Sequence, residues 1–152
     1  MKEKLLTNPG YTKYKIIEVN VTQEDIDRGV RYNCTYCPIA KAMYRLVAFD
    51  LTSNDNYLTI DNCVRLIEAR GYGSLSKYII KLPTIAHRFI AAFDLGYACE
   101  PFKFGLIIPE DKWEFFKPEV LDNISGRPLT LIEARDLFYE KYPNSGNELI
   151  YT

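Results

Sequence analysis

The sequence is poor in histidine, and it contains no long apolar run. His87 is the only histidine among 152 residues, and there are four cysteines. No apolar segment approaches the roughly 20 residues that a bilayer-spanning helix needs. No basic-then-apolar leader precedes the first predicted strand, so we expect a cytoplasmic protein whose thiols are reduced. These absences argue against a membrane protein and against a disulfide-stabilised secreted one.

An excess of charge of either sign is also missing. Nineteen Lys and Arg residues face 20 Asp and Glu residues, which gives a formal net charge of −1. The basic residues are scattered rather than clustered. Because non-specific duplex binding depends on neutralising many phosphates, this balance argues against a duplex nucleic acid as the partner.

Recognisable catalytic constellations are absent as well. No Ser or Cys nucleophile motif accompanies His87, and an ordinary, partly exposed helix position is the alternative for that residue. The segment 71–73, Gly-Tyr-Gly, lacks the Gly-Lys-Ser/Thr ending of a phosphate loop. The carboxylates are spread along the chain, so no pair is placed for acid–base work. The sequence therefore predicts a protein that is not an enzyme and needs no cofactor.

The pair Cys34 and Cys37 is the most metal-like feature of the chain. A structural zinc site needs four ligands, and the remaining candidates, Cys63, Cys99 and His87, fall in different predicted elements. A thioredoxin-like redox pair would need a βαβ pattern that is not seen here. We interpret the two cysteines as small, buried apolar residues at the start of a helix and predict no metal site, with zinc as the alternative.

What the sequence does contain is typical of an ordinary globular domain. Hydrophobic residues make up 47% and charged residues 26% of the chain, which includes twelve Tyr and eight Phe. Many aromatic side chains fit either an interaction surface with stacked bases or simply an aromatic core. At this length one domain with a substantial core is expected.

The stretch from Lys15 to Met43 holds the densest local signals. An alternating strand over 16–21 leads to Thr22, which forms a capping-box pattern with Asp25. Gly29 is predicted to end the following turn in a left-handed conformation. A second helix is predicted to begin at Pro38 and to run to about residue 47.

The rest of the chain predicts further strands and two further helices. Strands are expected over 57–60, 63–70, 77–82 and 101–109; helices are expected from 83 to about 95, with Gly96 as the cap, and from 130 to about 142. The predicted fold class is α+β, with an antiparallel sheet wrapped around two main helices and a C-terminal helical appendage.

The predicted organisation has three parts. Residues 1–14 form an N-terminal arm, residues 15–109 a core domain, and residues 110–152 a C-terminal extension packed on the core. The extension holds an aromatic cluster (Trp113, Phe115, Phe116) and a helix whose docking residues are predicted to be Ile132, Leu137, Phe138 and Tyr142.

Cations and aromatic residues near predicted turns are the candidate ligand-binding groups. Arg65, Arg70 and Lys103 are predicted to hold phosphate, and Tyr72 or Phe93 to stack on a base. Ordinary surface charge is the alternative at each position, and the helical spacing of Phe93 also fits the core.

Two groups of motifs carry a family resemblance. The first comprises VTQEDIDRG at 21–29 and CTYCPIAKA at 34–42; the second comprises LP at 82–83, FIAAFDLG at 89–96 and PFKF at 101–104. Together they resemble a widespread family of small phage and bacterial proteins, and within it the chain is similar to the first Thoeris anti-defence family. The resemblance covers roughly residues 16–108.

The resemblance implies a function that needs no catalytic group. Members of this family bind and sequester cyclic ADP-ribose-type signals made by bacterial TIR-domain enzymes, and some hold cyclic oligonucleotide signals. It implies a phage protein acting in the host cytoplasm as a homo-oligomer, a dimer or hexamer, that binds a small cyclic nucleotide. A protein-binding inhibitor of a bacterial defence complex, with its interface on Trp113–Phe116 and the last helix, is the alternative.

Overall fold

The computed structural model describes residues 12–48, 56–60, 63–70 and 74–146. Of residues 56–59, 63–70 and 74–79 it describes the backbone only. The predicted N-terminal arm therefore lies almost wholly outside the described residues. In chain order the elements are β1 (Tyr14–Val21), α2 (Gln23–Arg28), α3 (Pro38–Tyr44), β2 (Asn56–Ile60), β3 (Cys63–Arg70), β4 (Ser74–Lys81), α4 (Thr84–Asp94), β5 (Phe102–Pro109), the 3₁₀ helix η1 (Glu110–Phe115), α5 (Pro118–Leu121) and α6 (Leu131–Lys141).

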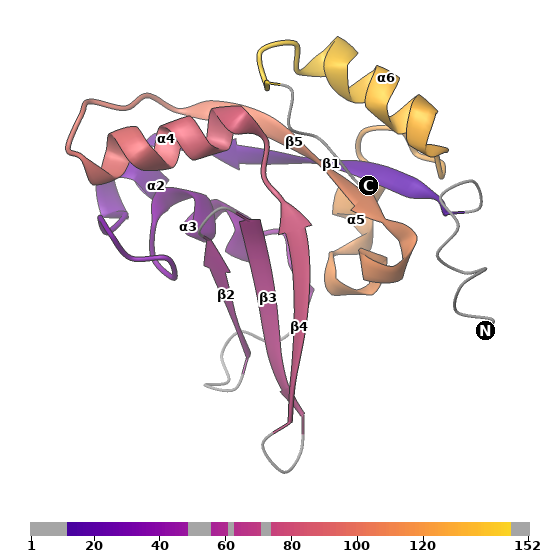
Figure 1. The fold of residues 1–152 in the computed structure, drawn as a ribbon, viewed down its shortest axis with the longest axis horizontal. Helices are drawn as coiled ribbons and strands as arrows, with labels where there is room; N and C mark the ends of the chain where they lie inside the picture. Colours follow the sequence, from indigo (N-terminus) through magenta and orange to yellow (C-terminus); the bar gives the residue numbers. More distant parts are fainter. Residues whose placement is uncertain (1–11, 49–55, 61–62, 71–73, 147–152) are drawn as a thin grey trace.

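The α+β class and the antiparallel pairing agree with the sequence prediction, but the described strands form two sheets rather than one. β1 pairs with β5, and β2, β3 and β4 form a separate three-stranded sheet in that order. The predicted hairpin between the strands at 57–60 and 63–70 is confirmed by the β2–β3 register. In Figure 1 the three-stranded sheet extends away from β1–β5, and α6 lies on the other side of that pair from α3.

The main core lies against one face of β1–β5. Along β1, Ile17, Val19 and Val21 point into it, as the alternating pattern predicted, and their partners on β5 are Leu106, Phe104 and Phe102. α3 contributes its fully buried residues Ile39, Ala40 and Met43. Because successive strand residues face opposite sides, the remaining residues of β1 and β5 face away from this core.

A second core covers that opposite face. Ile16 and Ile107 pack there against Phe138 of α6 and against Tyr142, the residue directly after α6. The hydroxyl of Tyr142 donates a 2.7 Å hydrogen bond to the Glu18 carboxylate, and burial together with this carboxylate raises the pKa of Tyr142 far above its usual value. β1–β5 is thus covered on both faces, which explains why β5 is apolar nearly throughout.

The docking residues predicted for α6 are confirmed in part. Phe138 and Tyr142 are buried, and Leu137 is partly buried against the second core. Ile132 is 71% exposed, so its prediction as a docking residue is wrong. It lies one residue after Leu131, the first residue of α6, which is partly buried against the second core.

The aromatic cluster that follows β5 is not an exposed interface. Phe115 and Phe116 belong to the main core, and Trp113 packs against it while its indole N–H donates to the Ile108 carbonyl at 2.9 Å. Phe116 also forms an isolated antiparallel bridge with Val47. The proposed docking surface on Trp113–Phe116 is therefore wrong, because those rings stabilise the fold.

The two predicted glycine caps differ in outcome. Gly96 has a φ of +87°, as expected after the end of α4. Gly29 has a φ of −71°, so the left-handed conformation predicted for it is wrong. A side chain is excluded at Gly29 for another reason: a Cβ there would lie 2.6 Å from Cγ of Pro38. Glycine at this position lets the end of α2 pass close to the start of α3.

Candidate functional site

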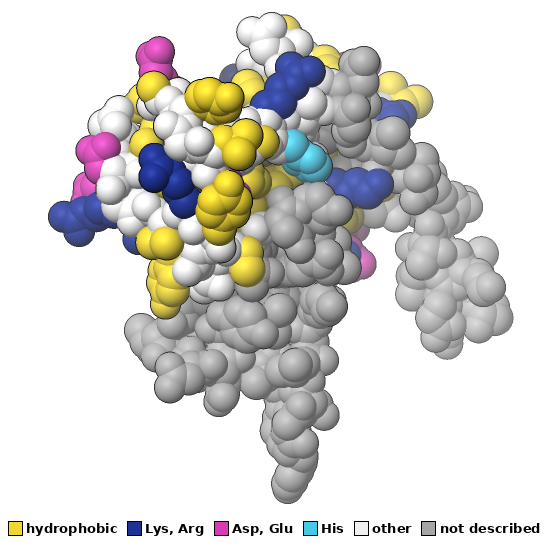
Figure 2. Space-filling model, turned by 60° about the vertical axis from the view of Figure 1, so that its left-hand side comes forward, with side chains coloured by type: hydrophobic (Ala, Val, Ile, Leu, Met, Phe, Trp, Pro, Cys, Tyr) yellow, Lys and Arg dark blue, Asp and Glu magenta, His cyan; other side chains and the backbone are white. Residues whose placement is uncertain are grey.

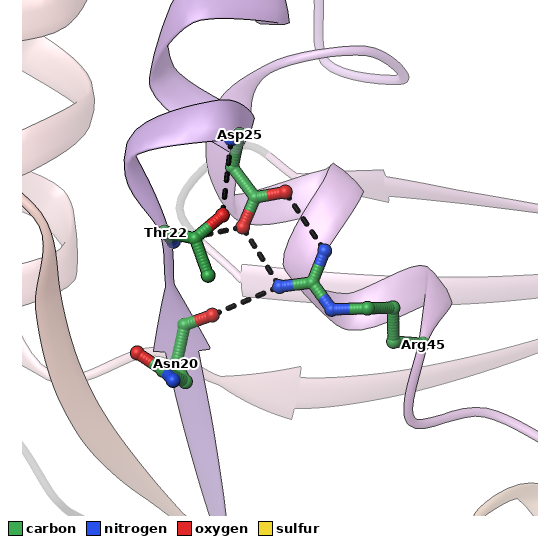
Figure 3. A network of polar contacts seen from close by, with 4 residues as sticks. All are labelled: Asn20, Thr22, Asp25 and Arg45. Atoms are coloured by element: carbon green, nitrogen blue, oxygen red, sulfur yellow. Dashed lines mark hydrogen bonds and ion pairs between the residues drawn. The ribbon is translucent and has the colours of Figure 1, made fainter.

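A polar network fixes the beginning of α2 and the end of α3 to each other (Figure 3). The backbone N–H of Asp25 donates to the Thr22 hydroxyl at 3.2 Å, and the backbone N–H of Thr22 donates to the Asp25 carboxylate at 2.9 Å. This is the capping box that the sequence predicted. Nη1 and Nη2 of Arg45 each donate to a different Asp25 oxygen at 2.8 Å, and Nη2 also donates to the Asn20 carbonyl at 3.0 Å.

Asp25 is a buried charge that this network stabilises. Its side chain is 5% exposed. Burial alone would raise the pKa of this carboxyl, but the hydrogen bonds from Arg45 and from the Thr22 backbone outweigh it, and the pKa of Asp25 lies below its usual value. Hydrogen bonding to Asp25 raises the pKa of Arg45 in turn. The pair is therefore charged at neutral pH.

A polar pocket of about 450 Å³ lies beside this network, and we call it the α2–α3 pocket. It is lined by Glu24, Asp25, Arg28, Lys41, Tyr44 and Arg45. Three cations and two carboxylates give the lining a net charge of +1. Arg28 and Glu24 approach to 3.4 Å, but both side chains are largely exposed, so this pair is weak.

Lys41 is the cation of the pocket without a carboxylate partner among the described residues. Its Nζ lies 5.9 Å from the centroid of the Tyr36 ring, so the pocket adjoins an aromatic surface. The Tyr36 side chain is 53% exposed. Asn33 fixes the backbone beneath it, because its side-chain oxygen accepts from the N–H groups of Thr35 and Tyr36 at 3.0 Å each.

Tyr36 also belongs to a larger exposed apolar surface, which we call the tyrosine surface. Its members share high exposure and come from the α2–α3 loop and the end of α4: Val30, Tyr32, Tyr36, Leu95 and Tyr97. Two contacts join these segments. Nε of Arg31 donates to the Phe93 carbonyl at 3.0 Å, and the backbone N–H of Tyr32 donates to the Asp94 carboxylate at 2.9 Å. Figure 2 turns this end of the molecule forward and shows hydrophobic side chains interspersed with basic ones.

Three of the five ligand-binding residues predicted from the sequence cannot be placed as side chains. Arg65 and Arg70 lie on β3, where Arg65 is paired with Thr59 of β2 and Ile79 of β4, but their side chains are outside the described residues. Tyr72 lies wholly outside them. Their roles as phosphate and base ligands stay predictions.

The other two predicted residues, Phe93 and Lys103, are not brought together. Phe93 is 7% exposed, its ring is stacked 6.1 Å from the Phe89 ring, and the guanidinium carbon of Arg31 lies 5.8 Å from its centroid, so the ring is largely covered by residues of the protein itself. The exposed Lys103 side chain lies on the α6 side of β5, 3.9 Å from Glu18.

Of the two cysteines in the pair, Cys37 stabilises the start of α3. Cys37 is buried and caps α3, with its Sγ accepting from the Ala40 N–H at 3.4 Å. Burial raises the pKa of the Cys37 thiol, which disfavours the reactive thiolate. Cys34 is exposed, so the prediction that it is buried is wrong. Across the described ranges, no three His, Cys, Asp or Glu residues gather as metal ligands; the Cys63 side chain lies outside those ranges.

Sequence reasoning did not find the α2–α3 pocket. The capping box at Asp25 was visible, but its ion pair with Arg45, twenty residues away, depends on how α2 and α3 pack. One local signal was available: Lys41 and Arg45 are four residues apart, a spacing that places two side chains on the same side of a helix. Nothing in the sequence linked the α2–α3 loop with the end of α4.

Comparisons with known proteins add no relative. The chain matches no protein-family profile, no curated protein and no solved structure. The similarity to the Thoeris anti-defence family therefore rests on the sequence motifs alone. In the part of the chain that the structure describes, no helix is both long and apolar enough to cross a membrane.

Proposed function

We propose that the protein is a phage-type anti-defence protein that binds and sequesters a cyclic ADP-ribose-type or related cyclic nucleotide signal in the host cytoplasm without cleaving it. One structural observation supports this function most: a pocket with three cationic side chains adjoins an exposed tyrosine ring at Tyr36. Cations that can bind phosphate next to a ring that can stack on a base suit a small phosphorylated nucleotide. The sequence motifs favour the same function, and they favour a homo-oligomer.

Sequestration works by mass action. A protein that outnumbers the signal and binds it more tightly than the effector does lowers the free signal without any chemical step. The site therefore needs affinity and a fixed geometry, and the Asp25–Arg45 network supplies a rigid wall for the pocket.

The proposal predicts that bound ligand is recovered unchanged. The purified protein is incubated with cyclic ADP-ribose, separated from free ligand by gel filtration and denatured by heat, and the released nucleotide is identified by mass spectrometry. We expect intact cyclic ADP-ribose, because no chemical step is part of the proposed function. Protein denatured before incubation is the control. Release of a cleaved product would indicate an enzyme, and absence of bound nucleotide would contradict the proposal.

Inhibition of a bacterial defence complex by direct protein binding is the second candidate. The tyrosine surface favours it, because large exposed tyrosines joined into one surface are typical of protein interfaces. Truncation after Pro109 would not separate the two candidates, since it removes Phe115, Phe116 and Phe138 from the cores.

Point variants separate the two candidates instead. The double variant Tyr32→Ser/Tyr97→Ser alters the tyrosine surface, and Ile132→Ser, at a comparably exposed position on α6, is its control. An inhibitor that docks through this surface loses its anti-defence action with the double variant while nucleotide binding in vitro is unchanged. If action and nucleotide binding instead change together, the protein acts through the nucleotide.

A further inference from the structure

We infer that the α2–α3 pocket binds one singly charged phosphate of a nucleotide, in a phosphodiester or in a pyrophosphate, with Lys41 as the phosphate-binding side chain and the Tyr36 ring as the surface on which the attached base stacks. This assignment rests on the proposed function for the choice of a nucleotide as ligand. It moves the site from the sequence-predicted residues of β3 to the helices α2 and α3. It also specifies the charge of the ligand, which the proposed function leaves open.

The charges of the lining favour a singly charged ligand. Asp25 is neutralised by Arg45 through two hydrogen bonds of 2.8 Å, and Glu24 faces Arg28 at 3.4 Å. Lys41 has no such partner among the described residues, and it accounts for the net charge of +1. A phosphodiester carries one negative charge and balances it, and the pyrophosphate of cyclic ADP-ribose, with one charge on each of two phosphates, exceeds it by only one. A triphosphate would bring several negative charges close to the two carboxylates, which opposes its binding.

The two arginines can assist without giving up their structural roles. Arg45 uses three of its N–H groups for Asp25 and Asn20, and a guanidinium has five. Its side chain is half exposed, so it presents a fixed, partly open guanidinium to the pocket. The pair of Arg28 with Glu24 costs little to break, because both side chains are largely exposed and water screens their attraction.

The size and the border of the pocket fit the same ligand. A volume of about 450 Å³ lies within the usual range of small-molecule sites. Because Nζ of Lys41 lies 5.9 Å from the Tyr36 ring centroid, one ligand can reach both groups. The Asn33 side chain accepts from the Tyr36 backbone N–H, so the backbone that carries the ring is already ordered before binding.

The test uses adenosine 3′,5′-cyclic monophosphate as the singly charged probe, ATP as the highly charged one and cyclic ADP-ribose as the proposed signal, each titrated by calorimetry at low salt. We expect the cyclic monophosphate to bind more tightly than ATP. Lys41→Gln should weaken its binding about tenfold, as expected for losing a hydrogen bond to a charged group. Tyr36→Leu should weaken it by a similar factor, whereas Tyr36→Phe, which keeps the ring, should bind like the unchanged protein.

Matched control variants show whether replacing a lysine or a tyrosine elsewhere in the protein also lowers the affinity. Lys141→Gln removes an exposed lysine from the last turn of α6, and Lys41→Gln removes a half-buried lysine from the last turn of α3. Tyr139→Leu removes a partly exposed tyrosine on α6. Neither control should change the affinity. Equal binding by Lys41→Gln and the unchanged protein, or tighter binding of ATP than of the cyclic monophosphate, would overturn the assignment.

The outcomes for cyclic ADP-ribose separate this site from the proposed function. If cyclic ADP-ribose binds and Lys41→Gln does not weaken it, the pocket assignment is wrong and the function stands. If only the cyclic monophosphate binds, and Lys41→Gln weakens it, the site stands and the proposed signal is wrong. If no nucleotide binds the unchanged protein, both are wrong.

Discussion

Replacing Gly105 with alanine is expected to lower the free energy of unfolding by about 3 kcal/mol, at the upper end of the usual cost of overpacking a core. Gly105 lies on β5 opposite Glu18, where α6 covers the strand. A Cβ at this position would lie 2.5 Å from Cε2 of Tyr142 and 3.0 Å from Cε1 of Phe138. Neither ring can move away easily, because the Tyr142 hydroxyl is hydrogen-bonded to the Glu18 carboxylate and the Phe138 side chain is fully buried. Urea denaturation followed by circular dichroism measures the change.

A double-mutant cycle tests the cause of that loss. Tyr142→Ala removes the ring that the new methyl group would meet. If the clash is the cause, Tyr142→Ala should cost clearly less stability in the Gly105→Ala protein than in the unchanged protein. A loss below about 0.5 kcal/mol for Gly105→Ala would contradict the close packing of α6 on β5.

Replacing Arg45 with alanine is expected to lower the free energy of unfolding at pH 7 by roughly 3 kcal/mol. The variant leaves the Asp25 carboxylate buried without its ion-pair partner, which typically costs 3–5 kcal/mol, and we take the lower figure because Arg45 itself is half exposed. Asp25 then retains only its hydrogen bonds with Thr22. Arg88→Ala, which removes an exposed arginine from α4, is the matched control and should change stability little.

The pH dependence of this loss carries a definite sign. The pKa of Asp25 is lowered in the folded protein, so the stability that its charge contributes is present above the unfolded pKa and is lost as the pH falls through the folded one. We expect the difference between the unchanged protein and Arg45→Ala to be largest near pH 7 and to shrink below about pH 4. A difference that is constant from pH 7 to pH 3 would show that the ion pair is not its source.

Local signals in the sequence predicted most of the secondary structure. The capping box at Thr22, the proline at the start of α3 and the glycine after α4 each act over a few residues, and all three lie where the sequence placed them. The helix predicted to reach residue 47 ends at Tyr44, because Val47 pairs with Phe116 instead. A contact between segments so distant in the chain leaves no local pattern.

The candidate site was harder to predict for the same reason. The pocket exists because the ion pair of Asp25 with Arg45 holds α2 and α3 together. The tyrosine surface exists because Arg31 and Tyr32 form hydrogen bonds with the end of α4. The predicted phosphate ligands were cations near turns. Cations can bind phosphate, but the sequence does not show which of their side chains lie close together in the fold. Phe93 illustrates the difference: its helical spacing already indicated the core, and the structure places it there.

Binding of a nucleotide at the α2–α3 pocket can be followed through the amide chemical shifts of the isotope-labelled protein during a titration with cyclic ADP-ribose. We expect the largest shifts on residues 22–45, around Lys41 and Tyr36, and unchanged amides in α6. Largest shifts on β3 and β4 would return the site to Arg65, Arg70 and Tyr72. Unchanged spectra at saturating ligand would contradict nucleotide binding itself.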